Sequence, residues 1–153
     1  MKIFSALCLS LLILTGCATS YQPRGLSGGF EEIRLDDNIF KVSFKGNQYT
    51  SKEKAMDYAV LRSSEIALAH NFKFFVIKGS EDYSKISTEY NVQRNNQYYN
   101  RYSNTPYTVS QDTTTKPRIA LLIECYTDRP VTGSALYNAE MTRENIKHKY
   151  DIQ

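Results

Sequence analysis

The sequence predicts an α+β protein: a small antiparallel sheet of about four strands with one main helix packed on one face and a short C-terminal helix. Residues 38–45 alternate strictly between apolar and polar side chains, as in a strand that buries one side. Residues 51–70 repeat apolar side chains at the helical period, and residues 118–126 form another largely apolar strand. Because the helix and the sheet each have one apolar face to cover, we expect them to pack together.

The composition is that of one ordinary globular domain. The chain has 153 residues, of which 41% are hydrophobic and 23% are charged, and these values argue against a disordered or fibrous protein. The formal net charge of +3 provides no broad electrostatic basis for binding nucleic acid. We therefore expect a single domain over residues 30–150 and no nucleic-acid partner.

A hairpin is expected at the start of this domain. Residues 30–35 alternate as a first strand, and the turn-forming residues 36–38 follow it. A second strand runs over residues 38–45 and closes at Gly46. A turn between two alternating segments predicts that the strands pair antiparallel.

The main helix has recognisable start and stop signals. Thr50 and Glu53 have the spacing of a capping box, in which each side chain satisfies a free amide at the helix start. Asn71 can adopt the left-handed conformation that ends a helix. The expected buried arc consists of small and apolar residues: Ala55, Met56, Ala59, Val60, Ile66, Ala67 and Ala69. Asp57 and Ser64 lie opposite this arc, so we expect them to face solvent.

Residues 72–77 are apolar on both faces, which predicts a central third strand. Residues 79–115 differ from the rest: they consist largely of Ser, Thr, Asn, Gln and Tyr and contain half of the 12 tyrosines. A structureless loop of this length is unusual in a compact domain, so this insert is either a projecting hairpin or a mobile segment. Of these possibilities we favour partial disorder with extensions of the flanking strands.

The last two elements are a strand and a short helix. Residues 118–126 form the fourth strand, and residues 128–130 break it. Four side chains share one face of this strand: Ile119, Leu121, Ile123 and Cys125. Asn138 can cap a final helix over residues 139–149.

Residues 1–16 have the features of an export signal. A positive start at Lys2 precedes the apolar residues 3–14, which are too few to span a bilayer. Leu14-Thr15-Gly16-Cys17 matches the bacterial lipobox, which predicts that Cys17 receives diacylglycerol and palmitate-like acyl chains and becomes the first mature residue. The alternatives are an ordinary secretory signal with an incidental cysteine and an uncleaved apolar helix.

The residues around the lipobox predict a location. Ala18 stands where lipoproteins retained in the inner membrane commonly carry Asp, so we expect sorting to the outer membrane with the domain facing the periplasm. Residues 17–29 are rich in Gly, Ser, Thr and Pro, which predicts a lipidated N-terminus followed by a flexible tether. Cys8 leaves with the signal and Cys17 is acylated, so Cys125 remains as a small buried hydrophobe rather than a disulfide partner or reactive thiol.

Several motifs carry a resemblance to a known group of proteins: Tyr21-Gln22-Pro23, Gly28-Gly29-Phe30, Arg34-Leu35, Phe40, Val42, Phe44, Gly46-Asn47, Thr50, Asp57, Leu61-Arg62, Glu65 and Phe74-Phe75-Val76. The chain resembles a family of small proteobacterial lipoproteins of the outer-membrane type, known mainly as uncharacterised conserved envelope proteins. The resemblance covers residues 14–78 well and residues 118–126 loosely, and residues 79–115 have no counterpart. It implies an envelope location and supplies no catalytic residues.

Two candidate contact sites emerge. Arg62 lies within the apolar arc of the helix, with Glu65 one turn further on. Its guanidinium either faces an anionic ligand, such as a peptide or glycan carboxylate, or forms a structural ion pair, and we favour the second interpretation. The second site lies in the insert and consists of Tyr98, Tyr99 and Tyr102. Three interpretations fit these tyrosines: a solvated loop, contact with a protein and contact with a glycan.

Signatures of catalysis are missing from the sequence: it contains no metal-spaced His/Cys cluster, nucleophile elbow or phosphate-binding glycine loop. We therefore expect no enzyme, no metal and no cofactor. The expected function is a membrane-anchored accessory protein that binds another envelope protein through the insert or a sheet edge. The alternatives are a binder of cell-wall glycan, peptide or another small anionic ligand, and an unrecognised hydrolase.

Overall fold

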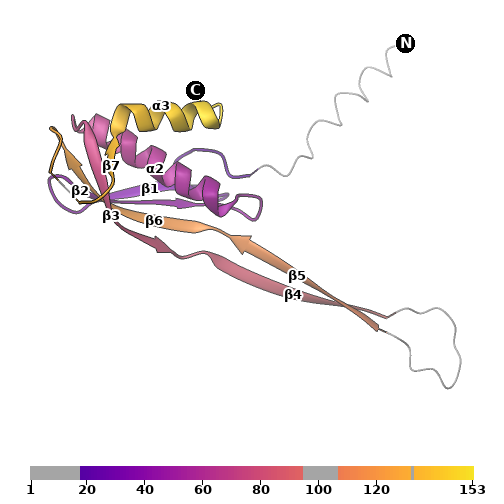
Figure 1. Cartoon of the computed structure of the whole chain (residues 1–153). Coiled ribbons are helices and arrows are strands. Elements are labelled where there is room, and N and C mark those ends of the chain that lie inside the picture. The colour runs from indigo at the N-terminus through magenta and orange to yellow at the C-terminus, as the bar shows by residue number, and fades with distance from the viewer. Residues whose placement is uncertain (1–17, 95–106, 132) are drawn as a thin grey trace, which may run out of the picture.

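The computed structural model describes residues 18–94, 107–131 and 133–153 (Figure 1). The predicted signal of residues 1–16 and the lipidation site Cys17 lie outside the described residues. The elements of the described chain follow in order: β1 Gly29–Arg34, β2 Ile39–Lys45, α2 Lys52–Ala69, β3 Phe74–Asp82, β4 Lys85–Arg94, β5 Tyr107–Lys116, β6 Arg118–Tyr126, β7 Leu136–Asn138 and α3 Ala139–Lys149.

These elements confirm the predicted α+β class. The main sheet has the order β1-β2-β6-β3-β7, and each pair of neighbouring strands is antiparallel. The sheet has five strands instead of about four, because β7 adds an edge of only three residues, too short to show a period in the sequence. The expected hairpin is confirmed as β1 and β2. The middle strand is β6, while β3, predicted to be central, is interior with only the short β7 beyond it.

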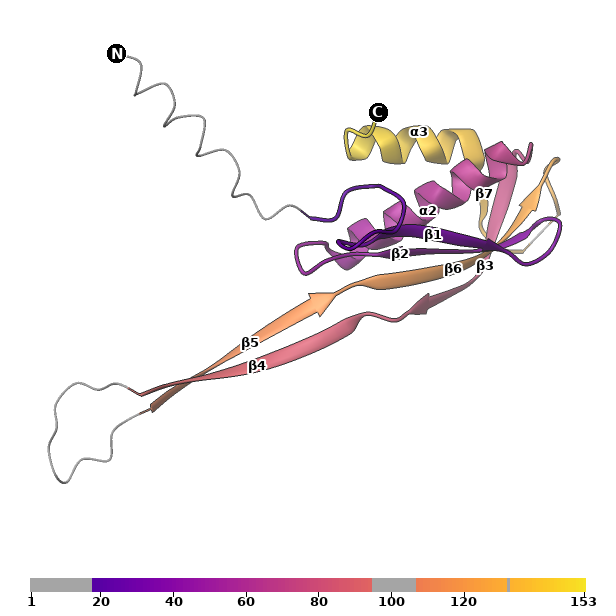
Figure 2. The ribbon, with the colours of Figure 1, turned by 180° about the vertical axis from the view of Figure 1, so that it is seen from behind.

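Both helices lie on the same face of this sheet (Figures 1 and 2). The core forms where α2 packs against the apolar sides of β2, β3 and β6. Its members with almost no exposed surface include Val42, Phe44, Phe75, Leu121 and Ile123. The helix contributes small side chains to this contact, Ala55, Ala59 and Ala67, which let the helix backbone approach the sheet closely.

The start of α2 differs from the predicted capping box. Ser51 is the cap, and its hydroxyl accepts a hydrogen bond from the Lys54 amide at 3.0 Å. The predicted cap, Thr50, instead accepts a hydrogen bond from the Thr19 amide at 3.0 Å. The predicted end is confirmed, since the helix stops at Ala69 and Asn71 is left-handed with φ 64°.

The helix α3 explains a further difference on α2. Ser64 was expected to face solvent but is fully buried, and its hydroxyl donates to the Leu61 carbonyl at 2.6 Å. Asp57 and Ser64 are seven positions apart and so lie on one stripe of α2. The helix α3 packs along this stripe, where Asp57 accepts hydrogen bonds from Lys149 at 2.7 Å and from the Tyr150 hydroxyl at 2.8 Å. The predicted α3 itself is confirmed, with Asn138 as its cap.

The predicted flexible tether is wrong for the described residues 18–29, which belong to the folded body. Thr19 is only 2% exposed, and its hydroxyl accepts from the Asn47 amide at 2.8 Å. The Tyr21 ring packs on Phe30, with the ring centres 4.8 Å apart. Composition misled here because Gly and Ser permit a flexible chain but equally permit a tightly folded one.

Gly28 shows how tightly this segment is folded. Its φ is +108°, and a Cβ atom placed on it would lie 2.2 Å from the Lys45 carbonyl oxygen at the end of β2. Only glycine fits such a conformation and such a close approach. The glycine that seemed to mark a tether therefore marks close packing of this segment against the sheet.

The strands β4 and β5 extend well beyond the body as a long hairpin (Figure 2). The strand β3 continues to Asp82, and β4 and β5 then pair antiparallel from Lys85–Lys116 at the base to Arg94–Tyr107. Ten residues of extended strand reach about 33 Å. Of the expected alternatives, the described part of the insert forms the projecting hairpin, and only β3 extends beyond its predicted end. Residues 95–106 of the insert lie outside the described residues.

Candidate functional site

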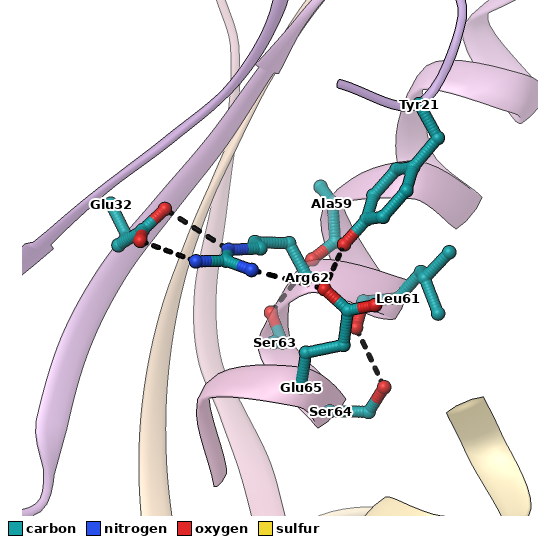
Figure 3. A network of polar contacts seen from close by, with 8 residues as sticks. All are labelled: Tyr21, Glu32, Ala59, Leu61, Arg62, Ser63, Ser64 and Glu65. Carbon is teal, nitrogen blue, oxygen red and sulfur yellow. Dashed lines mark hydrogen bonds and ion pairs between the residues drawn. The ribbon is translucent and has the colours of Figure 1, made fainter. Parts of the chain in front are cut away.

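Arg62 lies at the centre of a polar network that joins α2 to β1 (Figure 3). Its guanidinium donates to both carboxylate oxygens of Glu32, with distances of 3.1 Å from Nε and 2.6 Å from Nη2. A third bond runs from Nη1 to Glu65 at 3.0 Å, and the Tyr21 hydroxyl donates to the same Glu65 carboxylate. The guanidinium also lies over the Phe30 ring, 4.4 Å from its centre. One cation is thus shared by two carboxylates and an aromatic face.

The ionisation states of this network follow from its contacts. The hydrogen bonds that Arg62 donates to Glu32 are the main cause that raises the pKa of Arg62, so the guanidinium stays charged. Burial is the main cause that raises the pKa of the Tyr21 phenol, with Glu65 adding to it, so Tyr21 stays a neutral donor. The three guanidinium nitrogens of Arg62 are therefore all occupied by hydrogen bonds to the carboxylates of Glu32 and Glu65.

Of the predicted contact residues, the structure brings Arg62 and Glu65 together. The geometry matches the structural interpretation, a paired cation over the sheet edge, and an anionic ligand would have to displace Glu32 or Glu65. Sequence reasoning missed Glu32 and Tyr21. The available signal was the Glu31-Glu32 pair, because neighbours on a strand point to opposite faces and one carboxylate had to face the helix.

The opposite face of the sheet carries no helix in the described part of the chain (Figures 1 and 2). We call it the open face. One row of paired positions crosses it from β1 through β2 and β6 to β3: Ile33, Lys41, Leu122 and Gly79. The apolar members of this row are exposed, Ile33 by 61% and Leu122 by 37%, and the neighbouring Leu35 is exposed by 57%. An apolar group of this kind on a flat sheet surface is typical of a contact site.

Charged pairs surround these apolar side chains. Lys41 donates to Glu81 at 3.1 Å, and Arg118 donates to Glu31 at 3.3 Å. The Arg24 hydrogen bond is the main cause that lowers the pKa of Glu31, so this carboxylate stays ionised. Two shallow hollows of about 290 and 340 Å³ lie on either side of Lys41, one below Tyr83 and one beside Leu122. The open face thus has an apolar centre, fixed charges and two depressions.

The β4–β5 hairpin carries exposed apolar side chains of its own. Ile86 and Tyr90 alternate along β4 and are exposed by 67% and 66%. Their partners in the register are Thr115 and Gln111, so this side of the hairpin carries no charge over these pairs. Lys85 and Glu89 alternate with them and point the other way. Over these pairs, one side of the hairpin is therefore uncharged and the other side carries charged residues.

A separate groove lies between the two helices and the sheet. It has a volume of about 540 Å³ and apolar walls from Met56, Val60, Ile77, Tyr137 and Ile146. Asp57, Thr142 and Asn145 provide polar groups at its rim. Apolar walls with a few polar groups are the usual chemistry of a small-molecule site.

Cys125 lies on the core side of β6, as predicted, and is 1% exposed. Burial is the main cause that raises the pKa of its thiol to about 12, so the thiol is protonated and unreactive at neutral pH. Among the described residues, no group of His, Cys, Asp and Glu side chains is placed to hold a metal ion. The predicted contact residues Tyr98, Tyr99 and Tyr102 lie outside the described part of the chain.

Within residues 18–94, 107–131 and 133–153, no helix is long and apolar enough to cross a membrane. Searches of family models, curated proteins and solved structures found no match to this chain.

Proposed function

We propose that this protein is a lipoprotein of the bacterial outer membrane, anchored through acylated Cys17 with its domain in the periplasm, and that it acts as a non-enzymatic accessory that binds another envelope protein. The lipobox and the resemblance to small proteobacterial envelope lipoproteins support the anchor and the location. The binding surface we assign is the open face of the main sheet, with Ile33, Leu35 and Leu122 at its centre.

The open face is the observation that carries this proposal. A sheet that is covered on one side commonly turns a polar side toward water. Here Ile33, Leu35 and Leu122 are exposed on the side that the helices do not cover. Each exposed apolar side chain is unremarkable alone, but three of them on one surface, bordered by ion pairs, have the layout of a protein interface with an apolar centre and polar rim.

Photo-crosslinking in the native host tests this function. A photoreactive amino acid at Ile33 is expected to give one discrete protein adduct, whereas the same group at the exposed Glu144 on α3, on the other side of the sheet, is expected to give none. Leu122→Asp should abolish the adduct from position 33 while leaving the circular dichroism spectrum unchanged. Equal labelling from positions 33 and 144, or an adduct unaffected by Leu122→Asp, would contradict a specific partner on the open face.

A second candidate function is the binding of a small ligand, and the groove between α2 and α3 favours it. Its volume of about 540 Å³ and its mixed lining suit a molecule with an apolar part and one or two hydrogen-bonding groups, such as a cell-wall peptide fragment. Arg62 is not part of this groove, so the site differs from the one that the sequence predicts.

Calorimetry with purified cell-wall peptide and glycan fragments separates the two functions. Ligand binding predicts heat that disappears in Val60→Trp, which fills the groove, and persists in Leu122→Asp. Protein binding alone predicts no heat with either fragment and the crosslinking pattern described above.

A further inference from the structure

The folded body begins only two residues after the proposed acylation site. Thr19 is 2% exposed and is held by three hydrogen bonds, to Thr50 and Asn47 and to the Ser27 carbonyl. Two residues of extended chain span at most about 7 Å. If Cys17 carries lipid, the part of the body around Thr19 must therefore lie next to the bilayer surface.

Two exposed apolar side chains lie beside Thr19 on different loops. Leu26 precedes Ser27, whose carbonyl accepts from the Thr19 hydroxyl at 2.9 Å, and Leu26 is fully exposed at 109%. Tyr49 is exposed by 58%, and its amide donates to the side chain of Asn47, the residue that bonds to Thr19. Neither side chain has a role in the core. Both have the chemistry found at membrane interfaces, an aliphatic group and a tyrosine ring.

Two lysines add positive charge to the same corner. Lys45 ends β2 and Lys116 ends β5, and both are exposed. The chain segments that carry them are joined next to these lysines, where the Gly46 amide donates to the Pro117 carbonyl at 2.8 Å. Basic side chains near a bilayer are attracted to anionic headgroups.

We propose that Leu26, Lys45, Tyr49 and Lys116 form a membrane-contacting corner that seats the body directly on the bilayer surface. Leu26 and Tyr49 enter the boundary between headgroups and acyl chains, and the two lysines contact anionic headgroups. This inference depends on acylation of Cys17, which belongs to the proposed function. It replaces a domain on a loose tether with one held in a fixed orientation, which keeps the hairpin base at Lys116 close to the membrane.

Site-specific fluorescence of the full acylated protein tests the corner. Leu26→Cys and Tyr49→Cys are labelled with an environment-sensitive dye, and Cys125 contributes no background because its thiol is buried. Asp37→Cys serves as the matched control, since this exposed residue lies in the turn at the opposite end of β1 and β2. The protein is reconstituted in vesicles of phosphatidylethanolamine and phosphatidylglycerol containing lipids brominated near the headgroup end of the acyl chains.

We expect blue-shifted, bromolipid-quenched emission from positions 26 and 49, and water-like, unquenched emission from position 37. In vesicles of phosphatidylcholine alone, or with Lys45→Ser and Lys116→Ser together, quenching at position 26 should weaken. Water-like emission at 26 and 49 in a protein whose mass confirms acylated Cys17 would overturn the corner and leave the anchor intact. An unacylated Cys17 would overturn the anchor and the corner together. Blue-shifted emission without bromolipid quenching would mean that protein covers the corner, which also overturns the proposal.

Discussion

Arg62 on α2 and Glu32 on β1 form a two-bond ion pair that ties the main helix to the outermost strand of the sheet. The two side chains are only 25% and 33% exposed. If one partner is lost, water therefore hydrates the charge of the other only in part. The pair lies 30 positions apart in the sequence and depends on the packing of α2 across the sheet.

Arg62→Met should therefore lower the free energy of unfolding by about 2 kcal/mol, because Glu32 and Glu65 both lose their cation. Arg143→Met is the control, since Arg143 pairs with Glu140 and Glu144 on the surface of one helix and should cost at most about 0.5 kcal/mol. Urea unfolding measures both. Equal losses in the two variants would show that the α2–β1 pair contributes no more than a surface pair.

Gly28→Ala should destabilise the protein by about 2 kcal/mol or more, because φ is positive and the added Cβ would clash with the Lys45 carbonyl. Gly25→Ala, in the same loop, meets nothing within 4 Å and should change stability by less than about 0.5 kcal/mol. Thermal or urea unfolding of both variants tests whether residues 18–29 are folded. If neither substitution changed the stability of the protein, the flexible-tether interpretation would be correct.

Stability at alkaline pH should depend on Cys125. Burial raises the pKa of its thiol from an ordinary value near 9 to about 12, so between these values the unfolded chain loses this proton and the folded chain keeps it. The unfolded state then binds fewer protons, and the free energy of unfolding falls as pH rises from 9 to 12. Comparing the wild type with Cys125→Ala over this range isolates the effect from other titrating groups. The wild type should show the steeper fall, and identical slopes would contradict a buried thiol.

Removal of the hairpin should leave the body folded. Most contacts of the described hairpin residues are made between β4 and β5 themselves, and the Tyr83 amide and Ser84 hydroxyl at its base bond to Arg118. Replacing residues 86–115 by Asn-Gly joins the paired Lys85 and Lys116 through a tight turn. The free energy of unfolding should change by less than about 1 kcal/mol. A larger loss would mean that the hairpin supports the body.

Much of the fold could be predicted from short stretches of sequence. The alternation of residues 38–45, the left-handed Asn71 and the Asn138 cap are local signals, and each is present in the structure. The core side of β6, including Cys125, follows from a period of two residues. These features succeed because they depend on dihedral angles and periods set by neighbouring residues.

The candidate site was only partly predictable. Arg62 and Glu65 are one helical turn apart, so their proximity follows from the helix alone. Glu32 and Tyr21 join them only because β1 and residues 18–29 pack beside α2. The burial of Ser64 likewise depends on α3, whose position no local pattern specifies.

Short sequence patterns are enough to predict the class of fold, the main helix, the β1–β2 hairpin and a lipobox-like motif that ends at Cys17. Three features follow only from the packing of distant segments: the open face of the sheet, the burial of Thr19 in the body and the ion pair from Arg62 to β1. Periodicity and caps are signals that act within a few residues. These three features instead depend on strand register and helix packing between segments that are distant in the chain.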